Sequence, residues 1–403
     1  MAQEREVVII GGGIVGLSTA MALATGTPPA RALVLEKEDD IAAHQTGHNS
    51  GVIHSGIYYR PGSLKAELTV TGARELVEFC RLHGIAHDIC GKVVVATAEA
   101  ELPRLMELQR RGTANQVPGG VELIGPERLR EIEPHAAGLK ALHVPATGIV
   151  DYVAVAHKYA DVVRRHGGEI RTRTAVRGIS RDGTNWVVET TTGTVRSRHL
   201  INCAGLYSDW IARRSGARPA LRIIPFRGEY YRLTPARQGL VKSLIYPVPD
   251  PAFPFLGVHF TRMIHGGVEA GPNAVLSLKR EGYRKTDFSA REAWSTFSFG
   301  GFWRLAARYW RTGAGEIHRS FSKRAFVRAL QRLLPELRNE DLEPGGAGVR
   351  AQAIDPAGAL VDDFSIEIMN DVVHVLNAPS PAATASIPIG RTIAARAREH
   401  FNW

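Results

Sequence analysis

The first fifty residues combine uninterrupted apolar runs with a glycine-rich turn. Residues 7–10 are four successive aliphatic side chains, and a second apolar run ends at Val34 and Leu35. Runs of this kind are typical of strands buried on both faces of a parallel sheet. Residues 11–16 (GGGIVG) lie between the two runs, and Ala20 follows at a position where a small side chain lets a helix pack closely on a sheet. The pattern therefore predicts a strand–turn–helix–strand unit.

Beyond this unit the apolar positions follow helical and strand periods in turn. Helical spacing predicts helices over residues 67–83, 99–111, 153–166 and 382–401. Other apolar segments predict strands over residues 92–97, 169–174 and 194–202, a hairpin over residues 179–189, and strands of a second sheet over residues 244–260. Because strands of the first type return late in the chain, we expect an α/β fold with a discontinuous nucleotide-binding domain.

The glycine turn has the spacing of a dinucleotide-binding site. Its candidate ligand-binding residues are Gly11, Gly13, Ile14, Val15 and Gly16. Such a turn lets the backbone approach a pyrophosphate at a helix N-terminus, where free N–H groups and the helix dipole favour anions. Glu36 lies twenty residues after the last of these glycines, where a carboxylate can bind ribose hydroxyls. A glycine-rich turn without a ligand is the alternative, and the turn alone does not distinguish FAD from NAD.

Two further groups of small residues favour FAD. Ala204 and Gly205 follow the strand predicted over residues 194–202, and Ser380, Ala382 and Thr384 lie near the start of the last predicted helix. Small residues let the backbone come close to a phosphate-bearing ligand, and the last helix would direct its N-terminus at that ligand. Three separate points of close approach suit a long, extended FAD. Unrelated turns of small residues are the alternative reading.

Length and cysteine content limit the class of protein. A chain of 403 residues exceeds one ordinary domain, so two interleaved lobes are expected. Cys80, Cys90 and Cys203 have neither disulfide nor metal-binding spacing, so we expect buried thiols and no metal site. The first predicted strand begins within six residues, which leaves no room for a signal peptide. No apolar run approaches the roughly 20 residues of a membrane-spanning helix. We therefore expect a cytoplasmic protein.

The net charge of +10 is concentrated in a basic, aromatic segment over residues 291–334. Residues 291–332 hold nine Arg or Lys, two acids and nine aromatic residues. Its arginines at helical spacing are Arg304, Arg308 and Arg311, and its tryptophans are Trp294, Trp303 and Trp310. This composition predicts a helix lying on an anionic membrane, which would place the protein at the inner face of the cytoplasmic membrane. A core-packed helix pair with a solvated basic face is an equal alternative. No nucleic-acid-binding motif accompanies the charge, so we expect no nucleic acid partner.

Several longer motifs carry a family resemblance. They are HQTGHNSGVIHSGIYY at residues 44–59, GSLKA at 62–66, PATGIVDY at 145–152, YPVP at 246–249, FLGVHFTR at 255–262, GPNAV at 271–275 and GVRAQ at 348–352. Together they resemble the FAD-dependent oxidoreductases of the D-amino-acid oxidase superfamily. Within that superfamily they are most similar to the L-2-hydroxyglutarate dehydrogenases and oxidases. The resemblance spans essentially the whole chain.

The resemblance implies a Rossmann-like FAD-binding domain, interleaved with an α+β substrate domain built on a mixed β-sheet. We expect residues 1–75, 145–215 and 343–403 in the first domain and residues 76–144 and 216–342 in the second. The cofactor-binding candidates then also include Lys37, Thr46, His48, Asn49, Ser50, Gly51 and Val176. Non-covalent FAD is expected, although some relatives carry covalent flavin on a histidine in a context similar to that of His48.

The reaction implied by the resemblance is the oxidation of L-2-hydroxyglutarate to 2-oxoglutarate, with hydride transfer to flavin N5. The hydroxyl proton needs a base, and histidine is the usual base near neutral pH. His54 and His259 are the catalytic candidates because both lie in motifs specific to the subfamily. We place His54 beside the flavin and His259 on the substrate side, and which of them takes the proton stays open.

A dicarboxylate substrate needs cationic groups in a site that excludes water. Arginine binds a carboxylate through two parallel hydrogen bonds, and Arg350, flanked by small residues, is the leading candidate. Further substrate-binding candidates are Lys65, Tyr58, Arg262 and Gln352. The electron acceptor is expected to be a membrane quinone or oxygen. An amino-acid or other 2-hydroxy-acid oxidase, and an RNA-binding or RNA-modifying flavoprotein, are the alternative functions.

Overall fold

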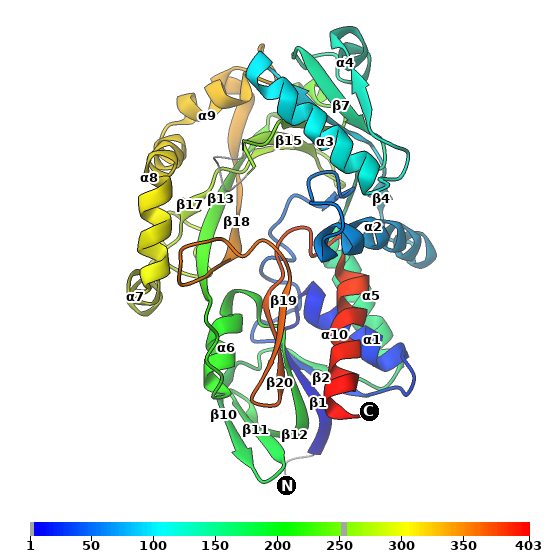
Figure 1. Ribbon diagram of the computed structural model, residues 1–403, viewed down its shortest axis with the longest axis vertical. Helices are drawn as coiled ribbons and strands as arrows, with labels where there is room; N and C mark the ends of the chain where they lie inside the picture. The colour runs from blue at the N-terminus through cyan, green and yellow to red at the C-terminus, as the bar shows by residue number, and fades with distance from the viewer. Residues whose placement is uncertain (1–3, 251–255) are drawn as a thin grey trace.

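The computed structural model describes residues 4–250 and 256–403, which form an elongated molecule of two lobes (Figure 1). In the view of Figure 1 the lower lobe contains β1 (Glu4–Ile10), β2 (Ala32–Leu35) and β12 (Gly193–Asn202), and the upper lobe contains β7 (Lys140–Val144) and β15 (His259–Arg262). Both ends of the chain belong to the lower lobe. Residues 251–255, within the segment where strands were predicted over 244–260, lie outside the described residues.

A largely parallel sheet forms the centre of the lower lobe. Its eight strands are β1 (Glu4–Ile10), β2 (Ala32–Leu35), β9 (Glu169–Arg171), β10 (Val176–Asp182), β11 (Asn185–Thr190), β12 (Gly193–Asn202), β19 (Ser365–Met369) and β20 (Val372–Asn377). β1 lies between β2 and β12 and runs parallel to both, and β20 also pairs with β12 in parallel. Because helices cover both faces, residues 7–10 of β1 are buried throughout. The predicted α/β class is confirmed.

Helices α1 (Ile14–Thr25), α5 (Tyr152–Arg165) and α10 (Ser386–Phe401) pack on one face of this sheet (Figure 1). Val7 and Ile9 point to this face, where they share a core cluster with side chains of all three helices. Val8 and Ile10 point to the other face, which α6 (Ser208–Arg214) covers. α2 (Leu64–His83) lies beside α10 (Figure 1). Strand alternation therefore sorts the apolar residues of β1 between two helical layers.

The upper lobe is built on a mixed sheet of nine strands. They are β5 (Lys92–Ala96), β6 (Glu122–Ile124), β7 (Lys140–Val144), β13 (Arg222–Leu233), β14 (Leu244–Pro247), β15 (His259–Arg262), β16 (Val268–Gly271), β17 (Val275–Leu276) and β18 (Leu342–Ile354). β5 and β14 pair in parallel, whereas the other strand pairs of this sheet are antiparallel. A small third sheet contains β3 (Val52–Ile53), β8 (Gly148–Val150) and β4 (His87–Asp88).

The sheets divide the chain differently from the predicted boundary at residue 343. β18 belongs to the nine-stranded sheet, because its backbone is paired along its length with β13. The segment that returns to the first sheet therefore begins with β19. α2 likewise runs across the boundary predicted between residues 75 and 76. Long-range strand pairing decided both differences, and residue composition carries no signal of it.

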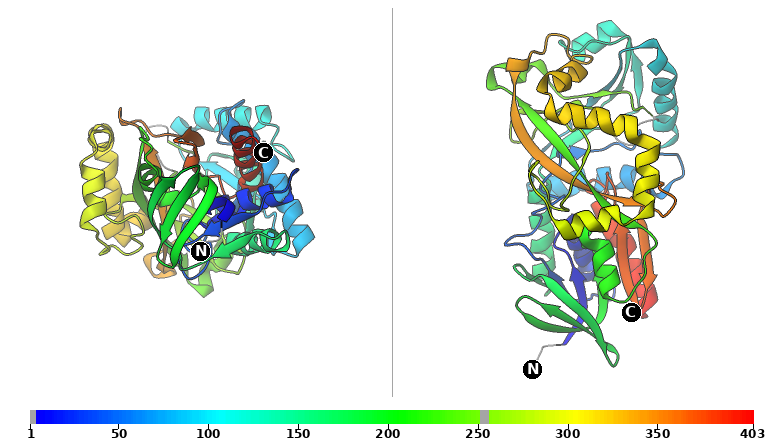
Figure 2. Two further views of the ribbon diagram at one scale, coloured as in Figure 1. Left: turned by 90° about the horizontal axis from the view of Figure 1, so that it is seen from below. Right: turned by 90° about the vertical axis from the view of Figure 1, so that its left-hand side faces the viewer.

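The predicted basic, aromatic segment consists of α7 (Ala290–Phe297), α8 (Gly300–Phe321) and α9 (Lys323–Leu330), on the outer side of the second sheet (Figure 2, right). Phe302 and Leu305 of α8 pack in a buried cluster with Ile224 and Ile354. The tryptophans and arginines named above for this segment are exposed. The helical spacing of the arginines is interrupted, because α8 has a kink at Tyr309 with φ −116° and ψ 18°. The segment therefore packs one face on the core and leaves a basic, aromatic face in solvent.

The described part of the upper lobe also contains helices α3 (Leu102–Ala114) and α4 (Pro126–Ile132). Across the described parts of the chain, no helix has the length and apolar character needed to cross a membrane.

Candidate active site

A cavity of about 610 Å³ is lined by residues of both lobes. The lower lobe contributes the β1–α1 turn, the segment after β2, the end of β12 and the segment that precedes α10. The upper lobe contributes residues of β13, β14, β15 and β18. A cavity shared in this way brings sequence segments that are hundreds of residues apart into one site.

The β1–α1 turn presents backbone groups to this cavity. Gly11 has a φ of +114°, and a Cβ on it would lie 2.4 Å from the Cys203 carbonyl oxygen, so only glycine fits. α1 has Gly13 as its N-cap and no acidic residue in its first turn, and the backbone N–H of Ile14 donates to Thr46 Oγ1 at 3.0 Å. The positive end of the helix dipole is therefore open to an anion. Gly16 does not line the cavity; a Cβ there would lie 2.0 Å from the Gly11 oxygen, so its small size lets the turn pack on the helix.

Glu36, predicted to bind ribose, lines the cavity directly after β2 and is 8% exposed. Its carboxylate accepts hydrogen bonds from the backbone N–H groups of Gly12 and Glu38, each at 2.9 Å. Carboxylate oxygens have about four lone-pair positions in all, so both contacts leave capacity for hydroxyl donors. Glu36 therefore shapes the glycine turn and can also bind a ligand.

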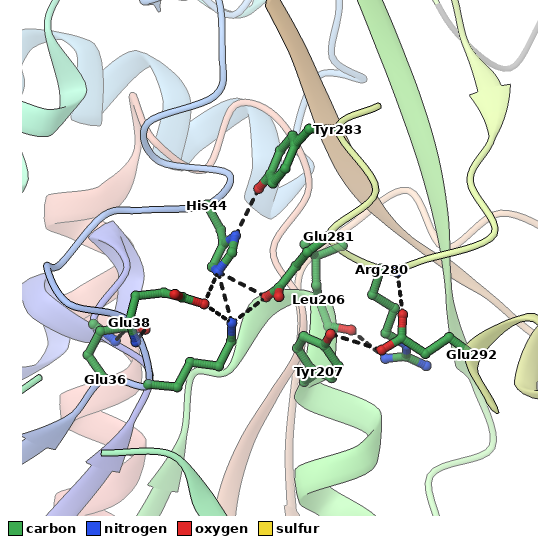
Figure 3. A network of polar contacts seen from close by, with 11 residues as sticks. Glu36, Glu38, His44, Leu206, Tyr207, Arg280, Glu281, Tyr283 and Glu292 are labelled. Atoms are coloured by element: carbon green, nitrogen blue, oxygen red, sulfur yellow. Dashed lines mark hydrogen bonds and ion pairs between the residues drawn. The ribbon is translucent and has the colours of Figure 1, made fainter. Parts of the chain in front are cut away.

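Lys37 lies in a network of polar contacts with Glu38, His44 and Glu281 that connects the two lobes, and Figure 3 labels these three partners. Its Nζ is 2.7 Å from Glu281 Oε1 and 2.9 Å from His44 Nε2, and it also pairs with Glu38. Burial disfavours the ammonium, but the hydrogen bonds to the two glutamates outweigh burial and raise the pKa of Lys37. The nitrogen and oxygen atoms of Glu38, His44 and Glu281 are close enough together to hold a metal ion. In this structure the Lys37 ammonium is the cation that these three side chains share. Glu281 belongs to the segment after β17, so the network closes one side of the cavity.

His54 and His259 both line the cavity, as the sequence predicted. Burial, with the added effect of the Lys92 charge, lowers the pKa of His54 to about 3 and that of His259 to about 4. Both imidazoles are therefore neutral at pH 7, and the same lowered pKa makes each a weaker base than a histidine in water. His259 Nδ1 lies 2.9 Å from the Gly257 carbonyl oxygen, so Nδ1 donates and Nε2 keeps its lone pair. Within the described residues, His54 Nδ1 is buried without a hydrogen-bond partner.

Arg350 is the one predicted substrate-binding residue that lines the cavity. It lies on β18 opposite Phe226 of β13, which lines the cavity as well. Burial lowers its pKa from the usual value, and the charges of Asp362 and Tyr59 partly offset that effect. An arginine in this position can bind a carboxylate through its planar fork of N–H groups.

The four other predicted substrate residues lie outside the cavity lining. Lys65 Nζ donates to the Asp362 carbonyl oxygen at 2.9 Å, Arg262 pairs with Asp88, Gln352 Nε2 donates to the Ala353 carbonyl oxygen at 3.0 Å, and the Tyr58 ring lies 4.5 Å from Lys92 Nζ. Each motif residue has therefore found a protein partner. Neighbours in a motif share a strand or loop, but their side chains point in different directions.

Sequence reasoning missed several residues of the lining. Tyr246 and Asn273 lie in the YPVP and GPNAV motifs, which were noted without a role for these side chains. Tyr230 lines the cavity from the middle of β13, where no motif marks it. Tyr246 and Asn273 could have been found as the polar or aromatic side chains of their motifs. Tyr230 lies outside the motifs, so no sequence signal pointed to it.

The profile of the FAD dependent oxidoreductase family matches residues 6–396. The chain belongs to this family. It is 51% identical over 399 residues to the L-2-hydroxyglutarate dehydrogenase of Indibacter alkaliphilus, covering 99% of this chain and 100% of that protein. It is 47% identical to the mitochondrial L-2-hydroxyglutarate dehydrogenase of Homo sapiens, covering 98% and 89%. Among solved structures, the FAD-bound L-alpha-glycerophosphate oxidase of Mycoplasma pneumoniae superposes with a TM-score of 0.79 at 25% identity, covering 100% of this chain and 95% of that one.

The cavity of this FAD-dependent oxidoreductase fits its cofactor. The predicted cofactor residues that line it are Gly11, Gly13, Ile14, Val15, Glu36, Lys37, Thr46, His48, Asn49, Ser50, Val176, Ala204, Gly205, Ser380, Ala382 and Thr384. Gly51 lies outside the lining; its φ is +65°, and a Cβ would lie 2.7 Å from the Val150 carbonyl oxygen. The backbone cradle, the positive end of the α1 dipole and the buried carboxylate are the groups that a pyrophosphate and a ribose require.

Proposed function

We propose that this FAD-dependent oxidoreductase oxidises L-2-hydroxyglutarate to 2-oxoglutarate. One observation carries the proposal: a nucleotide-binding turn, two neutral histidines and an arginine line the same cavity. Relatives that are 51% and 47% identical over nearly the whole chain bear the name of this dehydrogenase, which supports the choice of substrate.

Bound FAD supplies the two-electron oxidant. The substrate hydroxyl must lose a proton in the same reaction, and a histidine is the group that receives it. The bond from His259 Nδ1 to the Gly257 carbonyl oxygen supports His259 as this base, because it fixes the ring with an available Nε2. The backbone N–H of His54 donates to Thr384 Oγ1 at 3.1 Å, next to the start of α10, which supports a place for His54 beside the flavin.

Arg350 is proposed to bind one carboxylate of the substrate. Its planar guanidinium matches the carboxylate and stays charged. A fixed carboxylate also fixes C2 relative to the base, which is the main contribution that positioning makes to such a reaction.

The direct test is anaerobic mixing of the yellow holoenzyme with L-2-hydroxyglutarate while the visible flavin absorbance is followed. We expect rapid bleaching and recovery of 2-oxoglutarate. D-2-hydroxyglutarate, L-glutamate and lactate serve as controls, the amino acid testing the amino-acid oxidase alternative. Bleaching by L-glutamate but not by L-2-hydroxyglutarate would reject the proposed substrate.

The cofactor is proposed to be bound without a covalent bond. His48, the conceivable anchor, stacks on Tyr283 with ring centroids 4.2 Å apart and its Nδ1 lies 3.0 Å from the Ala347 carbonyl oxygen. Acid precipitation is expected to leave the yellow colour in the supernatant, and a yellow pellet would contradict the proposal.

The exposed face of α7 and α8 is proposed to contact an anionic membrane, where a quinone would accept the electrons. Trp294, Trp303 and Trp310 are 73%, 56% and 63% exposed, and basic residues lie between them. Indole rings and arginines together are typical of interfacial helices on anionic lipid. A quinone analogue and oxygen should be compared as electron acceptors. Release of hydrogen peroxide would identify oxygen as the acceptor.

Vesicle flotation tests the membrane contact. Wild-type protein is expected to float with vesicles containing anionic lipid and to be released by salt. Changing Arg304, Arg308 and Arg311 to Gln should abolish flotation, whereas changing Arg128 and Arg130 of α4 to Gln is the control on another exposed helix. Equal flotation with neutral vesicles, or retention on RNA at physiological salt, would count against the lipid contact.

A further inference from the structure

Lys92 is a buried ammonium without an anionic partner. It is the first residue of β5 and is 1% exposed. Among the described residues its Nζ makes no hydrogen bond, and no ion pair joins it to an acid. Its contacts are two aromatic faces, with Nζ 4.5 Å from the ring centre of Tyr58 and 5.1 Å from that of Tyr246. Buried lysines are normally paired, so this one needs an explanation.

Two aromatic faces stabilise an ammonium less than water does. A cation–π contact returns only part of the free energy that burial of a charge costs. Burial accordingly lowers the pKa of Lys92 to about 7. The side chain is therefore near its midpoint of protonation at neutral pH, and a nearby negative charge would move it to the charged form.

Lys92 lies directly behind the histidine end of the cavity. The ring of Tyr246, which covers the ammonium, also packs on His259 with ring centroids 3.9 Å apart. Both rings line the cavity, and Lys92 itself does not. Its charge nevertheless acts on both His54 and His259. The groups that contact or act on Lys92 are thus two tyrosines and two histidines, none of them negatively charged at neutral pH.

Lys65 is a second cationic group whose charge acts on His54. Arg350 and Lys65 act on each other electrostatically. The charges of Lys92 and Lys65 therefore both lower the pKa of His54. A dicarboxylate has two negative ends, and the proposed reaction places its hydroxyl between a base and these charges.

We propose that Lys92 is a positioning residue that attracts the second carboxylate of the substrate from one side-chain layer behind the cavity. When a dicarboxylate binds near His54 and His259, the Lys92 amine takes up one proton from solvent and becomes an ammonium. The bound carboxylate then has a fully charged ammonium near it, whereas Lys92 is only partly protonated before the dicarboxylate binds. This inference rests on the proposed oxidation of a dicarboxylate.

Calorimetric titration of the oxidised holoenzyme with glutarate tests the proton uptake without turnover. Measuring at pH 8 in two buffers of different ionisation enthalpy gives the number of protons taken up. We expect uptake in the wild type and tighter binding at pH 6.5 than at pH 8. Lys65, whose pKa is lowered to about 8, can add to this uptake, so Lys65→Met is measured as well. That variant should retain the share of uptake that belongs to Lys92.

Two substitutions at position 92 separate charge from proton exchange. Lys92→Met should weaken glutarate binding about tenfold and reduce the proton uptake. Lys92→Arg keeps a permanent charge, so it should restore much of the affinity while the proton uptake stays reduced. Lys140→Met, at an exposed lysine of the neighbouring β7, is the matched control and should change neither quantity. Flavin absorbance and melting temperature show whether each variant holds its cofactor.

Unchanged affinity and proton uptake in Lys92→Met would overturn the inference, and so would a wild type that binds glutarate without any uptake. The second result needs no variant, so it applies even if Lys92→Met does not fold. Failure of the proposed function looks different, because the wild type would then neither bind glutarate nor be bleached by L-2-hydroxyglutarate.

Discussion

The ion pair between Asp209 and Arg280 gives the sharpest stability prediction. Asp209 of α6 is 0% exposed and Arg280 is 1% exposed. Arg280 Nη2 lies 3.0 Å from Asp209 Oδ2, and Nη1 donates to the other carboxylate oxygen. Nη1 also donates to the Leu206 carbonyl oxygen (Figure 3). Arg280 is also next to Glu281, which pairs with Lys37 of the lower lobe. The pair therefore anchors the segment that closes the cavity.

Asp209→Asn keeps the shape of the side chain but leaves the guanidinium buried without its counter-charge. Breaking a buried pair in this way costs about 3–5 kcal/mol. With about 2.1 cal/mol/K of unfolding entropy per residue, that cost lowers the melting temperature of a chain of this length by about 4–6 °C. We also expect faster FAD release, since the Glu281–Lys37 contact loses its anchor.

Differential scanning calorimetry and flavin fluorescence measure the two effects. Asp182→Asn is the matched control, because Asp182 makes an exposed pair with Arg196 and such pairs contribute about 1 kcal/mol or less. The double variant Asp209→Leu with Arg280→Met removes both charges and should recover part of the lost stability. If Asp209→Asn melts within a degree of Asp182→Asn, the reasoning from burial is refuted.

Three further predictions concern the cofactor, the substrate and pH. Gly11→Ala should give protein without flavin absorbance, because its φ of +114° and the 2.4 Å approach of the Cys203 oxygen exclude a Cβ. Gly239→Ala is the control, because Gly239 has open space around it and no positive φ. Arg350→Gln should raise KM for L-2-hydroxyglutarate about 100-fold with FAD retained. An unchanged KM would reject the proposal that Arg350 binds a substrate carboxylate. Lys92 has a folded pKa of about 7 against 10.5 unfolded, so the unfolded chain binds more protons in that window and this group adds stability as pH rises. Lys92→Met should therefore melt higher than wild type near pH 7, and the difference should shrink toward pH 10.

The sequence by itself determined the local elements of the cofactor end. Residues 7–10 and the glycines after them form the predicted strand and turn, and Glu36 follows β2 as predicted and accepts a hydrogen bond from that turn. Backbone sterics and strand periodicity act over a few residues, so these features can be derived from neighbours in the chain. The family motifs likewise pointed to His54, His259 and Arg350, which line the cavity.

Only the tertiary structure decided which polar side chains face that cavity. Lys65, Tyr58, Arg262 and Gln352 lie in the same motifs but contact other parts of the protein. The assignment of β18 to the second sheet, and the position of Lys92 behind the histidines, followed from strand pairing and packing across lobes. The physical reason is that a side chain's partners depend on which distant surface packs against it, and local composition carries no record of that surface. The glycine turn was readable from the sequence because its glycines follow one another at a fixed local spacing, whereas the substrate end exists only where the two lobes meet.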